Sequence, residues 1–490
     1  MAGRSRTAAG LLVLTLVAGA CGSRLNSDQH DLAVNAALGR GSGGAVAGNQ
    51  TTASDSSASG ASGDTGTASG ATSGGTSGGT SGGTSGGTSG GGSGGSTSGT
   101  TPAAPKGGNG GATDKGVTGD TIRIGVLSDV TGPVPGLFQS SPQAVNSWAN
   151  MINSQGGIFG RKIKVDVIDS KTDAGANRAG ALQACSQDFA LVGSMSAYDD
   201  GGASSIDQCG IPDLSAIPTN AARGNEKNGF FAFPNTQQWY ALGPKKYIAD
   251  TFPQAPKTAA MIWLNANVTR SNANKNMEAG QSIGYQWVYQ KQVEITEPNY
   301  APYVVDMKNR NVQYVSMVGD ANNESRLLQA MAQQGFKPQV REFDSVVYDP
   351  RFLASAGSAA DGIIFALNIV PLEEASTSQE AQLYQQWLKK SFGSAKPDYF
   401  GVYAWSAARM FQQAVEAVGA DLTRAKLISN LQGLHSWDDH GMHAAQDVGG
   451  KKPTPCFVMM TVANGAFKRS YPSSGFDCNR APVYAVKSAG

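Results

Sequence analysis

Two blocks of this chain share one pattern, in which short apolar segments alternate with helical stretches over about 370 residues from Gly116 onward. The apolar segments are 122–127, 162–169 and 189–194 in the first block, and 258–264, 286–295, 312–320 and 361–368 in the second. A helical stretch over 141–157 ends in Gly156 and Gly157, as helix C-termini commonly do. Nearly continuous apolar strands separated by helices favour parallel sheets covered on both faces. The pattern predicts an α/β fold with two Rossmann-like lobes.

Hydroxyl side chains follow two strands of the first block. Ser194 ends the third apolar segment, Ser196 follows it in the turn, and Thr219 with Asn220 follow the next short apolar segment. Ligands of open parallel sheets bind beyond the carboxyl ends of the strands, where helix N-termini also present free N–H groups. These residues are therefore predicted to line a cleft between the lobes. The alternative role of the two serines, capping the following helix, is compatible with ligand binding.

Residues 1–20 have the form of a removable signal peptide. Arg4 and Arg6 supply a positive start, an apolar run covers 11–17, and small residues precede Cys21. The "VAGAC" arrangement resembles a bacterial lipobox, although Ala18 stands where that motif usually has Leu. The resemblance predicts a lipid on Cys21. The alternative is a freely secreted protein that is cut at the same bond.

Residues 21–115 are predicted to be a disordered tether. From about residue 41 they are almost entirely Gly, Ser, Thr and Ala, and "TSGG" repeats five times between Thr72 and Gly91. Such a segment buries too little apolar surface to offset its ordering entropy. The tether would hold the folded region away from a lipid anchor.

The chain contains five cysteines, an odd number for an oxidising compartment. Assigning Cys21 to lipid leaves four. Cys185 and Cys209 lie at the ends of two successive predicted helices, and Cys456 and Cys478 bracket a late hairpin-like segment. We expect two local disulfides, although four cysteines allow three connectivities. Reduced thiols would instead fit a cytosolic protein, which the signal peptide argues against.

Charge and motifs argue against several functions. The formal net charge is +1 at pH 7 and no basic stripe occurs, so nucleic acid is not an expected partner. No later segment has the about 20 apolar residues of a membrane helix. The "GSMSA" turn lacks the final glycine of a nucleophile elbow, and no phosphate-loop or dinucleotide motif is present. We expect neither an enzyme nor a cofactor.

Five phrases carry a family resemblance. They read "IRIGVLSDVTGPV", "INSQGGIFGRKIKVDVIDSKTD", "ALVGSMSA", "GIPDLSAIPTNA" and "DYFGVYAWSAARMFQQAVEAVG". In this order they resemble the type I periplasmic solute-binding proteins of branched-chain amino acid ABC importers, over about 116–479. The resemblance implies a Venus-flytrap fold with three crossovers, near 234–242, 367–371 and 456–462. Lobe 1 would comprise 116–238 and 369–455, and lobe 2 would comprise 239–368 and 456–490.

The resemblance also implies a site. Ser194, Ser196, Ala197, Thr219 and Asn220 would hold the α-carboxylate of an amino acid, and charge-assisted bonds of this kind contribute about 1.5 to 3 kcal/mol each. Asp344, with Asp349 as the alternative, would bind the α-ammonium, and Phe138 would pack on the ligand. The family's tyrosine is missing after the second lobe's first strand, where this chain has Thr269 to Asn272. Arg270 in that turn could approach the cleft and accept an anionic group.

One histidine cluster has metal-like spacing. His435, Asp438, Asp439, His440 and His443 fall close together, as zinc ligands can. Because Gly441 interrupts them and the family has a variable loop there, a solvated loop without metal is expected.

The sequence thus predicts an extracytoplasmic, lipid-anchored, monomeric receptor on a bacterial cell membrane. It would capture a small polar solute, an amino acid or a relative, and deliver it to an ABC permease with its ATPases. The alternative is a flytrap sensor that is not coupled to transport, since closure on ligand serves both roles.

Overall fold

The computed structural model describes residues 101–488. The predicted signal peptide, the lipidation site Cys21 and the tether up to residue 100 lie outside this range. Among the described residues, no helix is long and apolar enough to cross a membrane.

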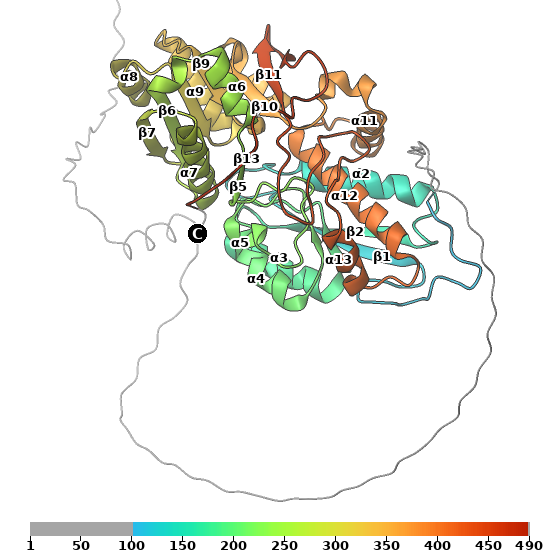
Figure 1. The fold of residues 1–490 in the computed structure, drawn as a ribbon. Helices are drawn as coiled ribbons and strands as arrows, with labels where there is room; N and C mark the ends of the chain where they lie inside the picture. Colours follow the sequence, from blue (N-terminus) through green and yellow to red (C-terminus); the bar gives the residue numbers. More distant parts are fainter. Residues whose placement is uncertain (1–100, 489–490) are drawn as a thin grey trace, which may run out of the picture. The chain divides into compact units, whose positions relative to one another are not determined.

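The first sheet has four parallel strands in the order β2-β1-β3-β4. These are β1 (Thr121–Ser128), β2 (Lys162–Asp169), β3 (Ala190–Val192) and β4 (Asp213–Leu214). Its helices are α2 (Ser140–Ser154), α3 (Ala174–Gln187), α4 (Asp200–Cys209), α5 (Ala221–Gly224), α11 (Gln379–Phe392), α12 (Tyr399–Val418) and α13 (Arg424–Gln432). Figure 1 shows β1 and β2 among α2–α5, α12 and α13.

The second sheet has seven strands in the order β12-β11-β10-β9-β8-β6-β7. They are β6 (Ala259–Leu264), β7 (Trp287–Val293), β8 (Tyr314–Val318), β9 (Val340–Phe343), β10 (Ile364–Leu367), β11 (Val458–Ala463) and β12 (Ala466–Tyr471). The pairs of β11 with β10 and with β12 are antiparallel, and the other pairs are parallel. The accompanying helices are α6 (Gly243–Thr251), α7 (Asn267–Ser282), α8 (Ala301–Asn309), α9 (Ala321–Gln333) and α10 (Pro350–Ala356).

The chain passes between the two sheets three times: between α5 and β6, between β10 and α11, and between α13 and β11. In the first passage, β5 (Trp239–Ala241) pairs with the last strand, β13 (Val483–Ala485). Two α/β lobes joined by three passages confirm the predicted fold class.

Helix α12 is buried on almost every side, which its apolar sequence requires. Its N-terminus is capped by Asp398, which accepts a hydrogen bond from the N–H of Gly401 at 2.7 Å. Trp148 of α2 packs edge-on against Phe411 of α12, and its indole N–H donates to Gln412 at 3.1 Å. These contacts attach α12 to α2, a helix of the first lobe.

Residues 101–115, which the sequence assigns to the tether, contact the first lobe. The side chain of Arg161 is fully buried and donates to the carbonyls of Gly111 at 3.0 Å and Asn109. The backbone N–H of Arg424 donates to the carboxylate of Asp114 at 2.7 Å. The packed chain therefore begins by residue 101 rather than at Gly116, because carbonyls of this segment accept from the buried guanidinium of Arg161 and the carboxylate of Asp114 accepts from the backbone of α13.

Both local disulfides are confirmed. Cys185 in α3 is bonded to Cys209 at the end of α4, and Cys456 is bonded to Cys478.

Candidate ligand-binding site

A cavity of about 390 Å³ lies between the carboxyl ends of both sheets. Loops after β1, β3 and β4 line it from the first lobe, and segments after β6, β8, β9 and β10 line it from the second. All three passages between the lobes also contribute to its wall, including Phe233, Asn368 and Cys456. The position is the one that open parallel sheets use for ligands.

Most of the cavity wall is apolar. Phe138 meets Phe400 edge-on with 5.2 Å between ring centroids, and Phe233 stacks on Tyr403 at 5.1 Å. Further apolar side chains on the wall are Pro133, Val134, Leu137, Met195, Ile217, Leu264, Val268, Ile295, Val318, Phe343, Leu367 and Phe457. A solute with a substantial apolar part fits these surroundings best, because its burial removes apolar area from water.

Four of the seven predicted ligand-binding residues line the cavity, namely Phe138, Ala197, Thr219 and Asp344. Ser194, Ser196 and Asn220 lie behind this wall and are buried. The hydroxyl of Ser194 accepts a hydrogen bond from the N–H of Leu127 at 3.1 Å, which ties β1 to the turn after β3. That turn begins at Gly193, which has a φ of +71°, and a Cβ at this position would lie only 2.4 Å from Cγ2 of Val145, so glycine is required.

A carboxylate of the protein occupies the donors that were expected to bind a ligand carboxylate. Asp129, directly after β1, is fully buried. It accepts from the hydroxyl of Ser196 at 2.9 Å and from the N–H of Ala197 at 2.7 Å. The hydroxyl of Ser170 and the N–H of Thr172 also donate to it, at 2.5 and 3.0 Å. A ligand carboxylate would have to replace Asp129 to use Ser196 and Ala197.

Asp199 engages the second predicted pair in the same way. It accepts from the N–H of Thr219 at 2.6 Å, from the N–H of Asn220 at 3.0 Å and from the amide of Asn220 at 2.9 Å. Burial raises the pKa of Asp199 to about 6, against the charge of Arg223 and these hydrogen bonds, which lower it. The hydroxyl of Thr219 donates to the carbonyl of Ser196 at 2.6 Å. The two polar turns are thus joined to each other.

Asp344 lies on the cavity wall with an exposed side chain and accepts from the N–H of Val346 at 2.8 Å. The surrounding walls displace bulk water and raise the pKa of Asp344 to about 6; the N–H of Val346 lowers it and the charge of Glu342 raises it further. The alternative, Asp349, caps α10 and binds Arg351 at 2.5 Å, and it does not line the cavity. Of the two, Asp344 is therefore the one available to a ligand.

The wall of the second lobe carries further acids. Asp320 and Glu342 line the cavity, and Glu342 is paired with the buried Lys245 at 3.0 Å. Behind them, the fully buried Glu324 has no hydrogen-bond partner on either carboxylate oxygen among the described residues. Burial, then the charges of Asp344 and Asp320, raise the pKa of Glu324 well above its ordinary value.

Residues 121–466 match the family described as periplasmic binding protein. The chain belongs to this family. Proteins of the family bind solutes and are not enzymes, and they work outside the cytoplasm.

A relative of this periplasmic binding protein in Brucella abortus (strain 2308) is named Leu/Ile/Val-binding protein homolog 1. It is 24% identical over 307 residues, which cover 61% of this chain and 79% of the relative.

Two solved structures share the fold of this binding protein. A fatty acid ABC transporter substrate-binding protein from Thermomonospora curvata has a TM-score of 0.63 and 18% identity, over 75% of this chain and 95% of that one. The branched-chain amino acid transporter substrate-binding protein LivJ from Streptococcus pneumoniae, in complex with isoleucine, has a TM-score of 0.60 and 15% identity. That match covers 72% of this chain and all of LivJ.

The expected approach of Arg270 to the cleft of this binding protein is wrong. Arg270 is exposed and absent from the cavity wall, whereas Val268, Thr269 and Asn272 face it. The turn that was expected here is the start of helix α7, which begins at Asn267. The helical twist therefore places Arg270 on the face away from the cavity. The sole cation on the cavity wall among the described residues is Lys275, one turn further along α7, which no motif singles out.

The histidine cluster of this binding protein is not a solvated loop, because two of its members are buried. His443 contacts the hydroxyl of Ser406 at 2.8 Å, and burial lowers the pKa of His443 to about 4. Asp439, fully buried, gathers with Glu380 and the exposed His440 in a group that has ligand atoms suited to a metal ion. Glu380, however, is already engaged by Trp405 at 2.7 Å and Arg409 at 2.8 Å.

Proposed function

We propose that this protein is an extracytoplasmic solute receptor, anchored by lipid on Cys21, that captures a small organic carboxylate with an apolar body and delivers it to an ABC importer. The observation that carries the proposal is the mainly apolar cavity of about 390 Å³ at the carboxyl edges of both sheets. A ligand that contacts both lobes favours the closed state, which a permease can recognise.

The names of the relatives support this ligand class. One is named for leucine, isoleucine and valine, one was solved with isoleucine, and one is named for fatty acid transport. These solutes differ in size, but all of them join a carboxylate to an apolar chain. Small-molecule pockets in proteins span about 300 to 1,000 Å³, and this cavity lies at the lower end of that range, so it suits a small member of this class.

A thermal-shift screen tests ligand capture. The mature protein, purified with its disulfides oxidised, is heated with amino acids, aliphatic and aromatic carboxylates, and polyols. A true ligand at 100 times its Kd adds about 2.7 kcal/mol of stability, which raises Tm by several degrees. If polyols stabilise the protein and carboxylates do not, the proposed ligand class is wrong.

Cell fractionation tests the anchor and the partner. The wild-type protein should sediment with membranes, and Cys21→Ala should be released into the medium or remain uncleaved. Cross-linking in the presence of the ligand should capture a permease. Capture of a sensor kinase instead would favour the signalling alternative.

A further inference from the structure

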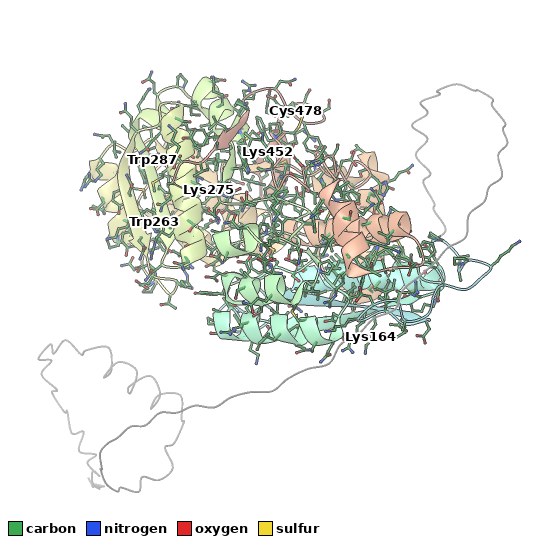
Figure 2. All side chains as sticks on the ribbon, turned by 60° about the horizontal axis from the view of Figure 1, so that its bottom comes forward. Lys164, Trp263, Lys275, Trp287, Lys452 and Cys478 are labelled. Carbon is green, nitrogen blue, oxygen red and sulfur yellow. A yellow bond between two sulfur atoms is a disulfide. The ribbon has the colours of Figure 1, made fainter. Side chains whose placement is uncertain are left out.

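Lys275 is a buried cation that faces the cavity. It lies on α7, 4% exposed, beside Asn272 and Asn276, which line the cavity from the same helix. Figure 2 shows Lys275 on α7, whereas Lys164 lies on the outer strand β2. Among the described residues, Lys275 contributes the single positive charge of the cavity wall.

The partners of Lys275 are all neutral. Its Nζ donates to the side-chain oxygen of Asn235 at 2.8 Å and to the carbonyl of Thr236 at 3.1 Å. An ammonium group has three N–H donors, so one remains for another acceptor. No carboxylate of the described residues lies within 4.0 Å of this Nζ.

Other buried cations of the described chain are compensated more fully. Lys245 is paired with Glu342 at 3.0 Å, and Arg223 is paired with Asp213 at 2.7 Å. Arg161 has no acidic partner but donates to four backbone carbonyls. A buried charge without such compensation is costly, and a ligand anion would supply what Lys275 lacks. Burial alone accounts for the lowered pKa of Lys275, about 7.

In the first lobe, the two polar turns that were expected to bind an anion are already engaged by carboxylates of the protein. The donors of Ser196 and Ala197 are held by Asp129, and those of Thr219 and Asn220 by Asp199. A second carboxylate placed there would meet a like charge at contact distance, which disfavours binding. The anionic group of a ligand is therefore directed to α7, and the aromatic and aliphatic wall receives the rest.

We propose that Lys275 binds the head group of an apolar monocarboxylic acid that has no α-ammonium group, such as a medium-chain fatty acid. The proposal rests on the proposed function and names its substrate class. A single charge is favoured over a dianion because Asp320, Glu342 and Asp344 also face the cavity. An α-ammonium group is disfavoured because it would lie close to Lys275, where no acidic side chain compensates it.

Calorimetric titration of the mature, oxidised protein with octanoate, 1-octanol and leucine tests this assignment. The wild type should bind octanoate at least tenfold more tightly than either other solute. Lys275→Met should weaken octanoate binding at least tenfold and change 1-octanol binding less than twofold. Lys164→Met is the matched control, because Lys164 is exposed on β2, and it should behave as the wild type.

Three outcomes would overturn the inference. If Lys275→Met binds octanoate as tightly as the wild type, the head group lies elsewhere while solute capture stands. If leucine binds best and is indifferent to Lys275, an amino acid displaces the carboxylates of the first lobe. If neither these solutes nor any carboxylate of the thermal screen binds the wild type, the proposed function fails too. Should Lys275→Met not fold, a crystal structure of the wild type with octanoate locates the carboxylate directly.

Discussion

The individual side chains that were predicted to bind a ligand carboxylate bind carboxylates of the protein instead. Ser196 and Ala197 hold Asp129, and Thr219 and Asn220 hold Asp199. A buried carboxylate needs several donors, and the polar turns after β3 and β4 provide them. The turns are therefore rigid parts of the cavity wall before any ligand arrives.

Ser196→Ala should affect stability more than binding. The substitution removes one hydrogen bond to a buried charge, so the free energy of unfolding should fall by about 1.5 to 3 kcal/mol. Because Ser196 does not line the cavity, the Kd of the ligand should change less than twofold. Denaturant unfolding and calorimetry measure the two effects, with the exposed Ser186→Ala as control. A tenfold loss of affinity at unchanged stability would mean that the ligand displaces Asp129.

Asp439→Asn should stabilise the protein. Both carboxylate oxygens of Asp439 lack hydrogen-bond partners among the described residues. Burial raises the pKa of Asp439 well above its ordinary value; the charge of Glu380 raises it further and that of Arg409 lowers it. An isosteric amide removes an uncompensated buried charge, so we expect a gain of about 1 to 3 kcal/mol at pH 7.

The stabilisation by Asp439→Asn should depend on pH. Because folding raises the pKa of Asp439, burying this carboxyl lowers the free energy of unfolding. This loss is absent below the ordinary pKa of 3.8 and grows as pH rises above it. The advantage of Asp439→Asn in Tm should thus be largest at neutral pH and vanish near pH 4. Tm scans with and without a chelator measure it. A chelator that lowers the Tm of the wild type, and not that of the variant, would instead identify a metal ion on Glu380, Asp439 and His440.

At the scale of elements, the two disulfides hold different structures. The bond between Cys185 and Cys209 joins α3 to α4, and neither cysteine lines the cavity. The bond between Cys456 and Cys478 holds the last passage between the lobes, and Cys456 lines the cavity. The loops that they close are similar in length, with sequence separations of 24 and 22 residues.

Removal of either disulfide should therefore cost similar stability but have different effects on binding. In the chain-entropy account, each loop contributes about 3 to 3.5 kcal/mol. The double variant Cys185→Ala with Cys209→Ala should lose that amount and keep its ligand affinity. The variant Cys456→Ala with Cys478→Ala should lose a similar amount and also bind less tightly. Equal affinities in both variants would show that the last passage does not shape the cavity.

At the scale of the whole molecule, ligand capture depends on contacts that join the lobes. Arg351 of α10 donates to the carbonyl of Gly136 in the loop after β1, at 3.4 Å. The side chain of Arg351 is 63% exposed and is oriented by Asp349. This hydrogen bond forms only when the lobes are close, so it favours the closed state.

Arg351→Ala should shift the molecule toward the open state. Because one exposed hydrogen bond contributes about 0.5 to 1 kcal/mol, ligand affinity should fall roughly two- to fivefold. Small-angle scattering should record a larger radius of gyration for the variant at subsaturating ligand, and the same value as the wild type at saturation. Arg270→Ala, exposed and away from the cavity, is the control. An unchanged affinity would mean that closure does not depend on this contact.

Local patterns were sufficient for the architecture. The apolar segments became β1, β2, β3, β6, β7, β8 and β10, and the local cysteine pairs became disulfides. Period and spacing act over a few residues, so they can be read without the fold. The short strand before Thr219 was also expected and is β4, whereas the four-residue strand β9 was not predicted, since so few residues carry too little pattern.

The use of each polar residue depended on contacts across the fold. Asp129 meets Ser196 at a distance of 67 positions along the chain, and Lys275 meets Asn235 at 40. Whether a hydroxyl or an ammonium faces a ligand or a protein group follows from which distant segments bury it, and no local pattern encodes that pairing. The sequence was thus enough to predict two lobes and the edge where they bind a solute. Which donors remain free at that edge emerged only when the chain was folded, because burial makes most polar groups find a partner within the protein.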